Sequence, residues 1–409
     1  MFSDSSEIVN KSFNFLLVSR ATRSAALIFV TLSLPLYLHL LHYSLIFIGL
    51  LYVPITLFNI ILILILGRLG DSIGYSKVLL LSEIFPVFGL LLITVSTNIY
   101  FIATGAIIAG ITGSAGGMRG AFSPGMTAFV ANNYPDELQR VTKLSLLTAT
   151  ASFFSIFGGI FLGLYTFLSR ITGALMFYRI FFAISLILII SSALALSRLR
   201  EYKRPRKTTR VMKKESFSYM LRIIIPNSLN AAAIGIAMPL LPLWFELKYH
   251  IGAGYVGDIY TISYAATALG SFISGRYLNG HFDGLKIASL ARILQGLLFA
   301  VIAFVPFLYI TAGIYIIRMA VAGIGSPLRG AINVRGINKE DYGTSTGIQG
   351  VSGRASQLTS GSSGYLMDFN LAFPLLIGGS IQAVGGALYY IMVKTWRPGN
   401  VAGLKKTKA

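Results

Sequence analysis

The chain is 409 residues long, with 55% hydrophobic residues and only 12% charged residues. Because soluble globular domains carry about 25% charged residues, this composition indicates that lipid rather than water surrounds most of the protein. The formal net charge is +20, which in a soluble protein would indicate a nucleic-acid partner. The densest basic run, residues 198–214, falls between two long apolar blocks, so we expect it to set membrane topology and predict no nucleic-acid partner. There is no cysteine, which excludes disulfides and Cys-ligated metals.

Twelve apolar blocks of helical length follow one another along the chain. A membrane-spanning helix needs about 20 mostly apolar residues, whereas barrel strands are about half as long and alternate, so the blocks predict an all-α membrane protein with the bilayer as its solvent. Arg20 and Arg23 precede the first block, but no small-residue cleavage site follows it, so we interpret it as a span and not as a signal peptide. The blocks are residues 25–41, 45–66, 78–95, 100–121, 144–167 and 175–196, then 221–245, 255–274, 287–305, 309–331, 346–367 and 371–393.

The connections between these blocks differ in charge. Even-numbered connections carry most of the Lys and Arg, including Arg68, Lys77 and the central basic run, whereas odd-numbered ones hold little beyond Arg170 and Lys248. Positive residues are retained on the cytoplasmic side of a membrane, so this pattern predicts that both chain ends and the central run are cytoplasmic. We therefore expect a multi-pass protein of the plasma membrane.

The first six blocks and the last six resemble each other. Three short matches occur in the same order at a nearly constant shift, which indicates a duplicated six-helix unit with parallel copies. We expect an N-terminal six-helix bundle at residues 1–197, a basic cytoplasmic linker at 198–216, and a C-terminal six-helix bundle with a short tail at 217–409. The matches are Pro35 with Pro242, 207 positions apart; Gly67 with Gly275, 208 apart; and Arg119 with Arg329, 210 apart.

The loop after the second block resembles a loop of the major facilitator superfamily, whose pattern is G-x-L-[AG]-D-[RK]-x-G-[RK]-[RK]. The resemblance implies that superfamily's fold, with twelve helices in two pseudo-symmetric six-helix bundles, and a gating role for Asp71 against residues 341–344. Gly67 and Gly74 suit a tight turn and close helix approach. The loop departs from the pattern after Asp71, and its second-half copy carries Asn279 in place of that carboxylate. It reads Gly67-Arg68-Leu69-Gly70-Asp71-Ser72-Ile73-Gly74-Tyr75-Ser76-Lys77.

Arginines inside the blocks are candidates for the transport path, because an ionised group at mid-bilayer costs at least about 2.5–3.5 kcal/mol unless it is paired or hydrated. Arg354 lies near the middle of the polar eleventh block, with Gln357 one turn away, and is either a substrate contact or an interhelical hydrogen-bond donor. Arg119 and Arg329 occupy equivalent places in the fourth and tenth blocks, where they either border a central cavity or snorkel to the interface.

Carboxylates are scarcer in the blocks than arginines. Glu83 lies about two turns into the third block and either forms an ion pair, with Arg119 as the candidate partner, or titrates as a coupling site. Asp258, near the outer end of the eighth block, is the second carboxylate candidate, and Asn59 and Arg318 are weaker candidates.

Other chemistry finds no support in the sequence. The four histidines lie at predicted helix ends without metal-ligand spacing, and no G-x-x-x-x-G-K-[ST] loop occurs, so we predict no metal, no cofactor and no enzymatic activity. We predict a secondary transporter that moves a small solute, anionic or polar organic, by alternating access. A proton, another ion or a solute gradient would drive it.

Two alternatives stay open at this point. The nearer one is a multidrug efflux antiporter of the same superfamily, although the fifth block lacks the Gly-Pro pair of many such antiporters and Ala106 stands where an arginine would precede Gly110. The other is a membrane sensor or assembly partner that retains the fold without transporting a solute.

Overall fold

The computed structural model describes residues 2–112, 122–134, 137–201, 212–274, 283–338 and 341–396. Within these ranges every regular element is a helix, as the composition predicted. The elements are α1 (Phe2–Leu40), α2 (Leu45–Ile73), α3 (Tyr75–Val95), α4 (Ile99–Ala109), α5 (Phe122–Asn133), α6 (Glu137–Gly163), α7 (Tyr165–Thr172), α8 (Ala174–Ser197), α9 (Lys214–Ala237), α10 (Leu241–Tyr249), α11 (Ala253–Ile273), α12 (Gly284–Ile302), α13 (Leu308–Arg335), α14 (Tyr342–Ser356), the 3-10 turn η3 (Gln357–Ser360), α15 (Gly361–Phe369) and α16 (Phe373–Lys394).

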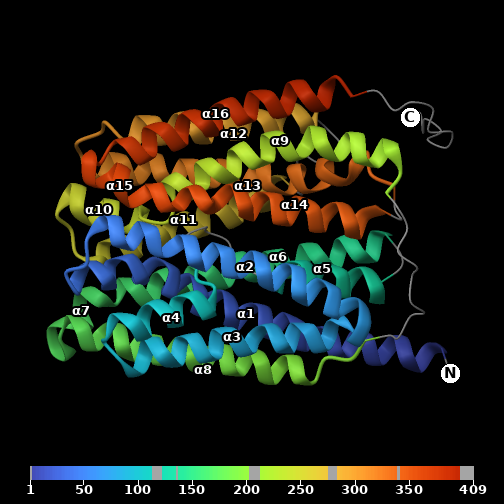
Figure 1. Cartoon of the computed structure of the whole chain (residues 1–409), viewed down its shortest axis with the longest axis horizontal. Helices are drawn as coiled ribbons and strands as arrows, with labels where there is room; N and C mark the ends of the chain where they lie inside the picture. Colours follow the sequence, from blue (N-terminus) through green and yellow to red (C-terminus); the bar gives the residue numbers. More distant parts are fainter. Residues whose placement is uncertain are drawn as a thin grey trace.

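The long helices lie side by side along one axis of the molecule (Figure 1). The N-terminal end of α1 and the C-terminal end of α16 lie at the same end of this axis, which we call the terminal end. The short helices α7, α10 and α15 lie at the opposite end. We call α1–α8 the first half and α9–α16 the second half.

Nine helices of the described part are long and apolar enough to cross a membrane. They match nine of the predicted blocks, and the fourth, eighth and eleventh blocks differ. The eighth is α11, which is long enough but more polar. The fourth is interrupted after α4, and the eleventh is divided into α14 and α15 by η3. Two of the three differences therefore come from breaks in the helix and not from a missing block.

The first span starts earlier than predicted. We expected residues 25–41, but the apolar part of α1 runs over Ser12–Leu40, so Arg20 and Arg23 lie inside the span. They are 0% and 4% exposed. The prediction was wrong because it took these arginines as the watery flank of a span, whereas the interior of the protein surrounds them.

The same helix pairings occur in both halves. In the first half α8 packs on α1 and on α3, and α3 packs on α4; in the second half α16 packs on α9 and on α12, and α12 packs on α13. In the predicted numbering these are spans 6 on 1, 6 on 3 and 3 on 4, then spans 12 on 7, 12 on 9 and 9 on 10. The repeat seen in the sequence therefore has a counterpart in the packing.

Small residues allow several of these helices to approach closely. An ideal Cβ built on Gly89 of α3 would lie 2.4 Å from the carbonyl oxygen of Gly105 in α4, and one built on Gly296 of α12 would lie 2.4 Å from that of Gly379 in α16. Lipid gives helices no hydrophobic reason to associate, so van der Waals contact between such surfaces holds them together.

The two halves meet along a seam that reaches the end opposite the termini. There α15 packs on α2, and α6 packs on α11. An ideal Cβ on Gly364 would lie 1.9 Å from the Leu45 carbonyl oxygen, and one on Gly159 would lie 2.5 Å from Thr261 Oγ1. The halves therefore touch through backbone at this end of the molecule.

Replacing Gly89 with alanine should destabilise the first half, because the added methyl group meets a backbone oxygen that a side-chain rotation cannot remove. We expect a loss of about 1–3 kcal/mol in the free energy of unfolding, measured by reversible unfolding in mixed detergent micelles. Gly313→Ala in α13 is the matched control, since no atom lies within 4 Å of its ideal Cβ. Equal stabilities of the two variants would contradict the close contact.

Candidate functional site

The fourth span stops partway through the protein. Gly110 has φ +65° and ψ +38°, a left-handed conformation in which glycine has no steric penalty. The Gly110 N–H donates to the Ile107 carbonyl (3.0 Å) and the Ile111 N–H to the Ala106 carbonyl (3.2 Å), the pattern of a Schellman motif. Helix α4 therefore ends by a defined cap and presents its carbonyl end to the protein interior.

Asn59 of α2 stabilises this break. Its Nδ2 donates to the Ile55 carbonyl of its own helix (2.9 Å) and to the Gly110 carbonyl (3.2 Å), and the side chain is 2% exposed. The last carbonyls of a helix lack partners within it, so a buried break requires such a donor. Asn59, a weak candidate from the sequence, therefore has a defined structural role at the break.

Arg354 of α14 reaches the break from the other half. Its Nη1 donates to Gln357 Oε1 (2.9 Å) and lies 3.5 Å from Thr112 Oγ1, two residues after Gly110. Both partners are neutral. The guanidinium is half-buried at the seam between the halves. It is positively charged and has no carboxylate partner among the described residues.

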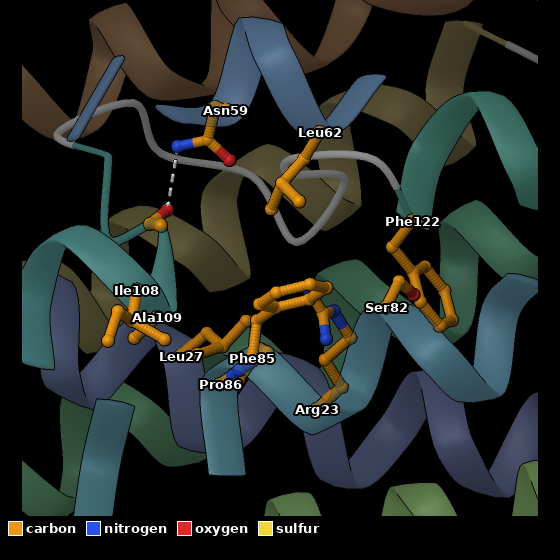
Figure 2. Close-up of a pocket in the computed structure, with 11 residues that line it drawn as sticks. Arg23, Leu27, Asn59, Leu62, Ser82, Phe85, Pro86, Ile108, Ala109 and Phe122 are labelled. Carbon is orange, nitrogen blue, oxygen red and sulfur yellow. Dashed lines mark hydrogen bonds between the residues drawn. The ribbon is translucent and has the colours of Figure 1, made fainter. Parts of the chain in front are cut away.

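A small cavity, with room for about one water molecule, lies beside the break. Figure 2 shows Asn59 entering from α2 on one side and Arg23 rising from α1 on the other, next to Phe85. The Arg23 guanidinium lies 4.6 Å from the ring centroid of Phe122. The remaining lining residues are mostly apolar. They are Leu27, Leu62, Ser82, Pro86, Ile108, Ala109 and Gly110.

Glu83 neutralises the arginine at the base of this cavity. Its Oε2 forms an ion pair with Arg23 Nη1, and its Oε1 accepts a hydrogen bond from Ser192 Oγ (2.7 Å), which in turn lies 2.7 Å from Ser19 Oγ. Buried Arg20 also interacts electrostatically with the Glu83 carboxylate. This buried network connects α1, α3 and α8.

The second half carries a different network at the same places. Asn230 lies 207 positions after Arg23, Arg292 lies 209 positions after Glu83, and Tyr389 lies 197 positions after Ser192, a shift that also separates the ends of α8 and α16. The Arg292 guanidinium lies 4.9 Å from the Tyr389 ring centroid. An arginine thus stands where the first half has its carboxylate.

A second arginine of this half, Arg318, is also buried among neutral groups. Its Nε donates to the Gln295 carbonyl (3.3 Å) and its Nη2 to Gln382 Oε1 (3.2 Å). The guanidinium carbon Cζ lies 3.4 Å from the Phe299 ring centroid. Gln382 Nε2 then donates to Asn230 Oδ1 (3.2 Å), which links α13, α16 and α9. Within the described ranges, no cluster of three His, Asp or Glu side chains able to hold a metal occurs.

The family model of the Major Facilitator Superfamily matches residues 16–361, most of the chain. The chain belongs to the Major Facilitator Superfamily. The resemblance found in the second-to-third loop is therefore confirmed, and with it the all-α membrane fold. Membership in this superfamily indicates a transporter of small solutes across a membrane and not an enzyme. A comparison with curated protein sequences found no match.

Solved structures of other transporters have the same fold. An auto-inhibited peptide transporter of the POT family aligns with a TM-score of 0.72 at 11% identity, over 96% of this chain and 98% of its own. A bacterial homologue of the human lysosomal transporter Spinster, inward-facing and occupied, gives 0.68 at 12% identity over 95% and 99%. The human organic anion transporter MFSD10 (TETRAN) gives 0.67 at 14% identity over 95% and 99%. At 11–14% identity, these comparisons show a shared fold and nothing more specific.

The superfamily loop has a different construction from the one we expected. Close approach was predicted at Gly67, but no atom lies within 4 Å of its ideal Cβ; the tight contact is at Gly70, whose ideal Cβ would lie 2.5 Å from the Tyr75 ring. Gly74 does adopt a positive φ of 97° at the turn between α2 and α3. The Asp71 side chain lies outside the described part, and Arg68 and Lys77 are exposed.

A carboxylate that the sequence did not single out completes this loop. Glu201, just after α8, accepts a hydrogen bond from the Ser76 N–H (2.9 Å) through Oε2 and so caps the start of α3. Asp341, placed by the resemblance opposite Asp71, is 5% exposed and accepts from the Lys213 N–H (3.2 Å) at the start of α9. Each half thus uses a carboxylate to satisfy backbone donors at a helix start on the terminal side.

The remaining predicted path residues do not gather around Arg354. Glu83 pairs with Arg23, while Arg119, its predicted partner, lies outside the described residues. Arg329 Nη1 lies close to Ala291, the residue before Arg292, since an ideal Cβ on Gly325 would lie 2.5 Å from Nη1 and 2.9 Å from Ala291 Cβ. Asp258 is exposed, and its Oδ1 would lie 2.6 Å from an ideal Cβ on Gly163 across the seam.

Sequence reasoning missed Arg23 and Arg292 in the bundles and Glu201 in the loop, and it ranked Arg318 only as a weak candidate. Arg23 was available as a charge close to an apolar block, and Arg292 and Arg318 were available as lone charges within blocks. Glu201 was the acidic member of an otherwise basic run. Two sequence features could therefore have identified these residues: an acidic residue within a basic run, and a single charged residue within or beside an apolar block.

Replacing Glu83 with glutamine should destabilise the protein strongly, because it leaves the Arg23 charge buried without its partner. We expect a loss of about 3–5 kcal/mol in the free energy of unfolding. Ser192→Ala, which removes one hydrogen bond to the same carboxylate, should cost about 1 kcal/mol. Unfolding in mixed micelles measures both.

The double variant Arg23→Met with Glu83→Leu provides the control for this prediction. It removes both charges together, so most of the stability lost in Glu83→Gln should return. A double variant no more stable than Glu83→Gln would contradict a stabilising role of charge pairing at this position.

Proposed function

We propose that this protein is a secondary transporter that carries a small organic anion by alternating access of its two halves. The halves are residues 1–197 and 217–409, joined by the basic linker 198–216, with both chain ends in the cytoplasm of a plasma-membrane protein. The observation that carries the proposal is Arg354, which places a positive charge at the seam, against the broken fourth span.

Charge balance supports an anionic substrate. A half-buried cation in a membrane protein is costly unless an anion or water compensates it, and the described partners of Arg354 are an amide and a hydroxyl. A substrate carboxylate, sulfonate or phosphate would receive two parallel hydrogen bonds from the guanidinium. The human relative of the same fold is an organic anion transporter, which agrees with this substrate class.

The apolar surroundings of the break favour an organic solute. The wall of the small neighbouring cavity is mostly apolar and aromatic, with Arg23 and Asn59 as polar groups, and the cavity lies beside the break to which Thr112 and Arg354 also belong. A solute with an anionic group at Arg354 and an apolar body turned to Phe85 and Phe122 suits this arrangement. A gradient of protons, another ion or a second solute drives the transport in this proposal.

Replacing Arg354 with glutamine should reduce anion uptake into proteoliposomes by at least about tenfold, because a charge-assisted hydrogen bond contributes about 1.5–3 kcal/mol. Arg354→Lys should retain part of the flux, since it keeps the charge and loses the planar fork. Arg222→Gln is the matched control, because Arg222 is also half-buried but donates to Met392 and Thr395, away from the seam.

The solutes offered decide between this proposal and its rivals. Aromatic carboxylates and sulfonates should be transported, and hydrophobic cations should not. Uptake of cations alone would instead indicate a multidrug antiporter. Two outcomes would contradict the proposal: a correctly folded wild-type protein that transports neither class, or an Arg354→Gln variant with unchanged anion uptake.

Alternating access requires the seam to open at the end opposite the termini. An ideal Cβ on Gly361 would lie 2.5 Å from Val53 Cγ2, so the β-carbons of residues 53 and 361 are at most about 4 Å apart, within disulfide range. Because the chain has no cysteine, Val53→Cys with Gly361→Cys creates a single defined pair. Oxidation should stop uptake and reduction should restore it; full flux through the cross-linked protein would exclude opening at this end.

A further inference from the structure

Arg292 of α12 is buried with unfilled hydrogen-bonding capacity. It is 4% exposed; Nη2 donates to Asn227 Oδ1 (2.9 Å) and Nη1 to the Pro226 carbonyl (3.4 Å), while Nε is buried with no hydrogen-bond partner. A guanidinium carries five N–H donors and always keeps its charge. Buried donors without partners are rare in proteins, so this side chain requires an explanation.

Arg329 of α13 raises the same question. Its Nη1 is buried without a hydrogen-bond partner and would lie 2.5 Å from an ideal Cβ on Gly325. The same ideal Cβ would lie 2.9 Å from Ala291 Cβ, so Arg329 Nη1 lies beside the residue that precedes Arg292. The Arg292 guanidinium lies 4.9 Å from the ring centroid of Tyr389, whose hydroxyl donates to Asn333 Oδ1 (2.9 Å), one helical turn after Arg329. Within the described ranges, no carboxylate forms an ion pair with either arginine.

The first half shows how the same place is satisfied when its charge is balanced. There the position equivalent to Arg292 is Glu83, which pairs with Arg23 and accepts from Ser192. In the second half the neutral Asn230 replaces Arg23, and an arginine replaces the carboxylate. Two neighbouring cations in a low-dielectric bundle are expensive unless an anion joins them.

The Arg292–Arg329 pair lies within reach of one surface of the protein. Arg292 is eight residues from the start of α12 and Arg329 is six residues from the end of α13, so at 1.5 Å per residue the pair lies about 9–12 Å inside the terminal end. Arg329 is half-buried, which leaves that side of the pair open. An anion in a lipid headgroup or in solution at this end is therefore close to the pair.

We propose that Arg292 and Arg329 form a binding site for a phosphate group inside the second half, separate from the seam at Arg354. Two guanidinium groups balance the charge of about −1.5 to −2 that a phosphate monoester carries at neutral pH, and their forks match its oxygens. Nε of Arg292 and Nη1 of Arg329 supply the unused donors. The phosphate comes either from the headgroup of an anionic lipid or from a free phosphate, and one experiment distinguishes these sources.

Thermal unfolding of the full chain in detergent, followed by the fluorescence of its two tryptophans, tests the site. One arm exchanges sodium chloride for sodium phosphate at constant ionic strength and pH. The other arm compares micelles doped with phosphatidic acid, whose headgroup is a phosphate monoester, and with phosphatidylcholine. A ligand that binds only the folded protein raises Tm, on the order of 2 °C when it is well above its dissociation constant.

Substitutions then assign any rise in Tm to this pair. Arg292→Gln and Arg329→Gln should each abolish the rise, whereas Arg335→Gln, an exposed arginine at the end of the same helix α13, should retain it. Arg292→Glu copies the arrangement of Glu83 and should fold without responding to phosphate. If Arg292→Gln cannot be purified, the half-buried Arg329 and the charge-balanced Arg292→Glu variant carry the test.

A rise with phosphate identifies a free-phosphate site, and a rise with phosphatidic acid alone identifies a lipid site. No rise in either arm would overturn the proposal. A rise that persists in Arg329→Gln, or that disappears equally in Arg335→Gln, would also overturn it, since surface charge would then explain the effect.

Discussion

The structure depends on the rule that a charge inside a lipid-embedded bundle must be compensated, by the protein, by water or by a bound anion. In the first half the rule is met by the ion pair of Arg23 with Glu83, and this pair holds α1 against α3 while Ser192 adds α8. The helix contacts around it rest on close glycine packing such as that of Gly89 with Gly105. The charge pair therefore selects which faces meet, and the small residues determine how closely they meet.

Most of the fold could be predicted from the sequence, because block length and loop charge are local properties. The errors have physical causes. The start of α1 was placed too late because Arg20 and Arg23 look like a hydrated flank, and their burial depends on Glu83, which lies 60 residues beyond Arg23. The break after α4 was missed because a left-handed Gly110 leaves the apolar pattern unchanged.

The candidate site was predictable only where its contacts are local. Gln357 follows Arg354 by one helical turn, so that pair was visible in the sequence and occurs in the structure. Thr112 lies 242 residues away from Arg354, in the other half, and nothing in its local sequence marks it. Arg292 and Arg318 were overlooked or ranked low because single charges within a block do not reveal whether they face lipid, a cavity or a neighbouring helix.

Glu83 in the first half and Arg292 in the second half occupy equivalent positions. The two halves therefore have the same helix packing but different buried charges. Potential inside a low-dielectric body spreads far from its source, since no mobile ions screen it there. In the first half Glu83 offsets one of the two buried arginines, Arg20 and Arg23, whereas the charges buried within the described helices of the second half, Arg292 and Arg318, are both positive. Such a body has a built-in lateral polarity, parallel to the bilayer plane, that two identical copies could never possess.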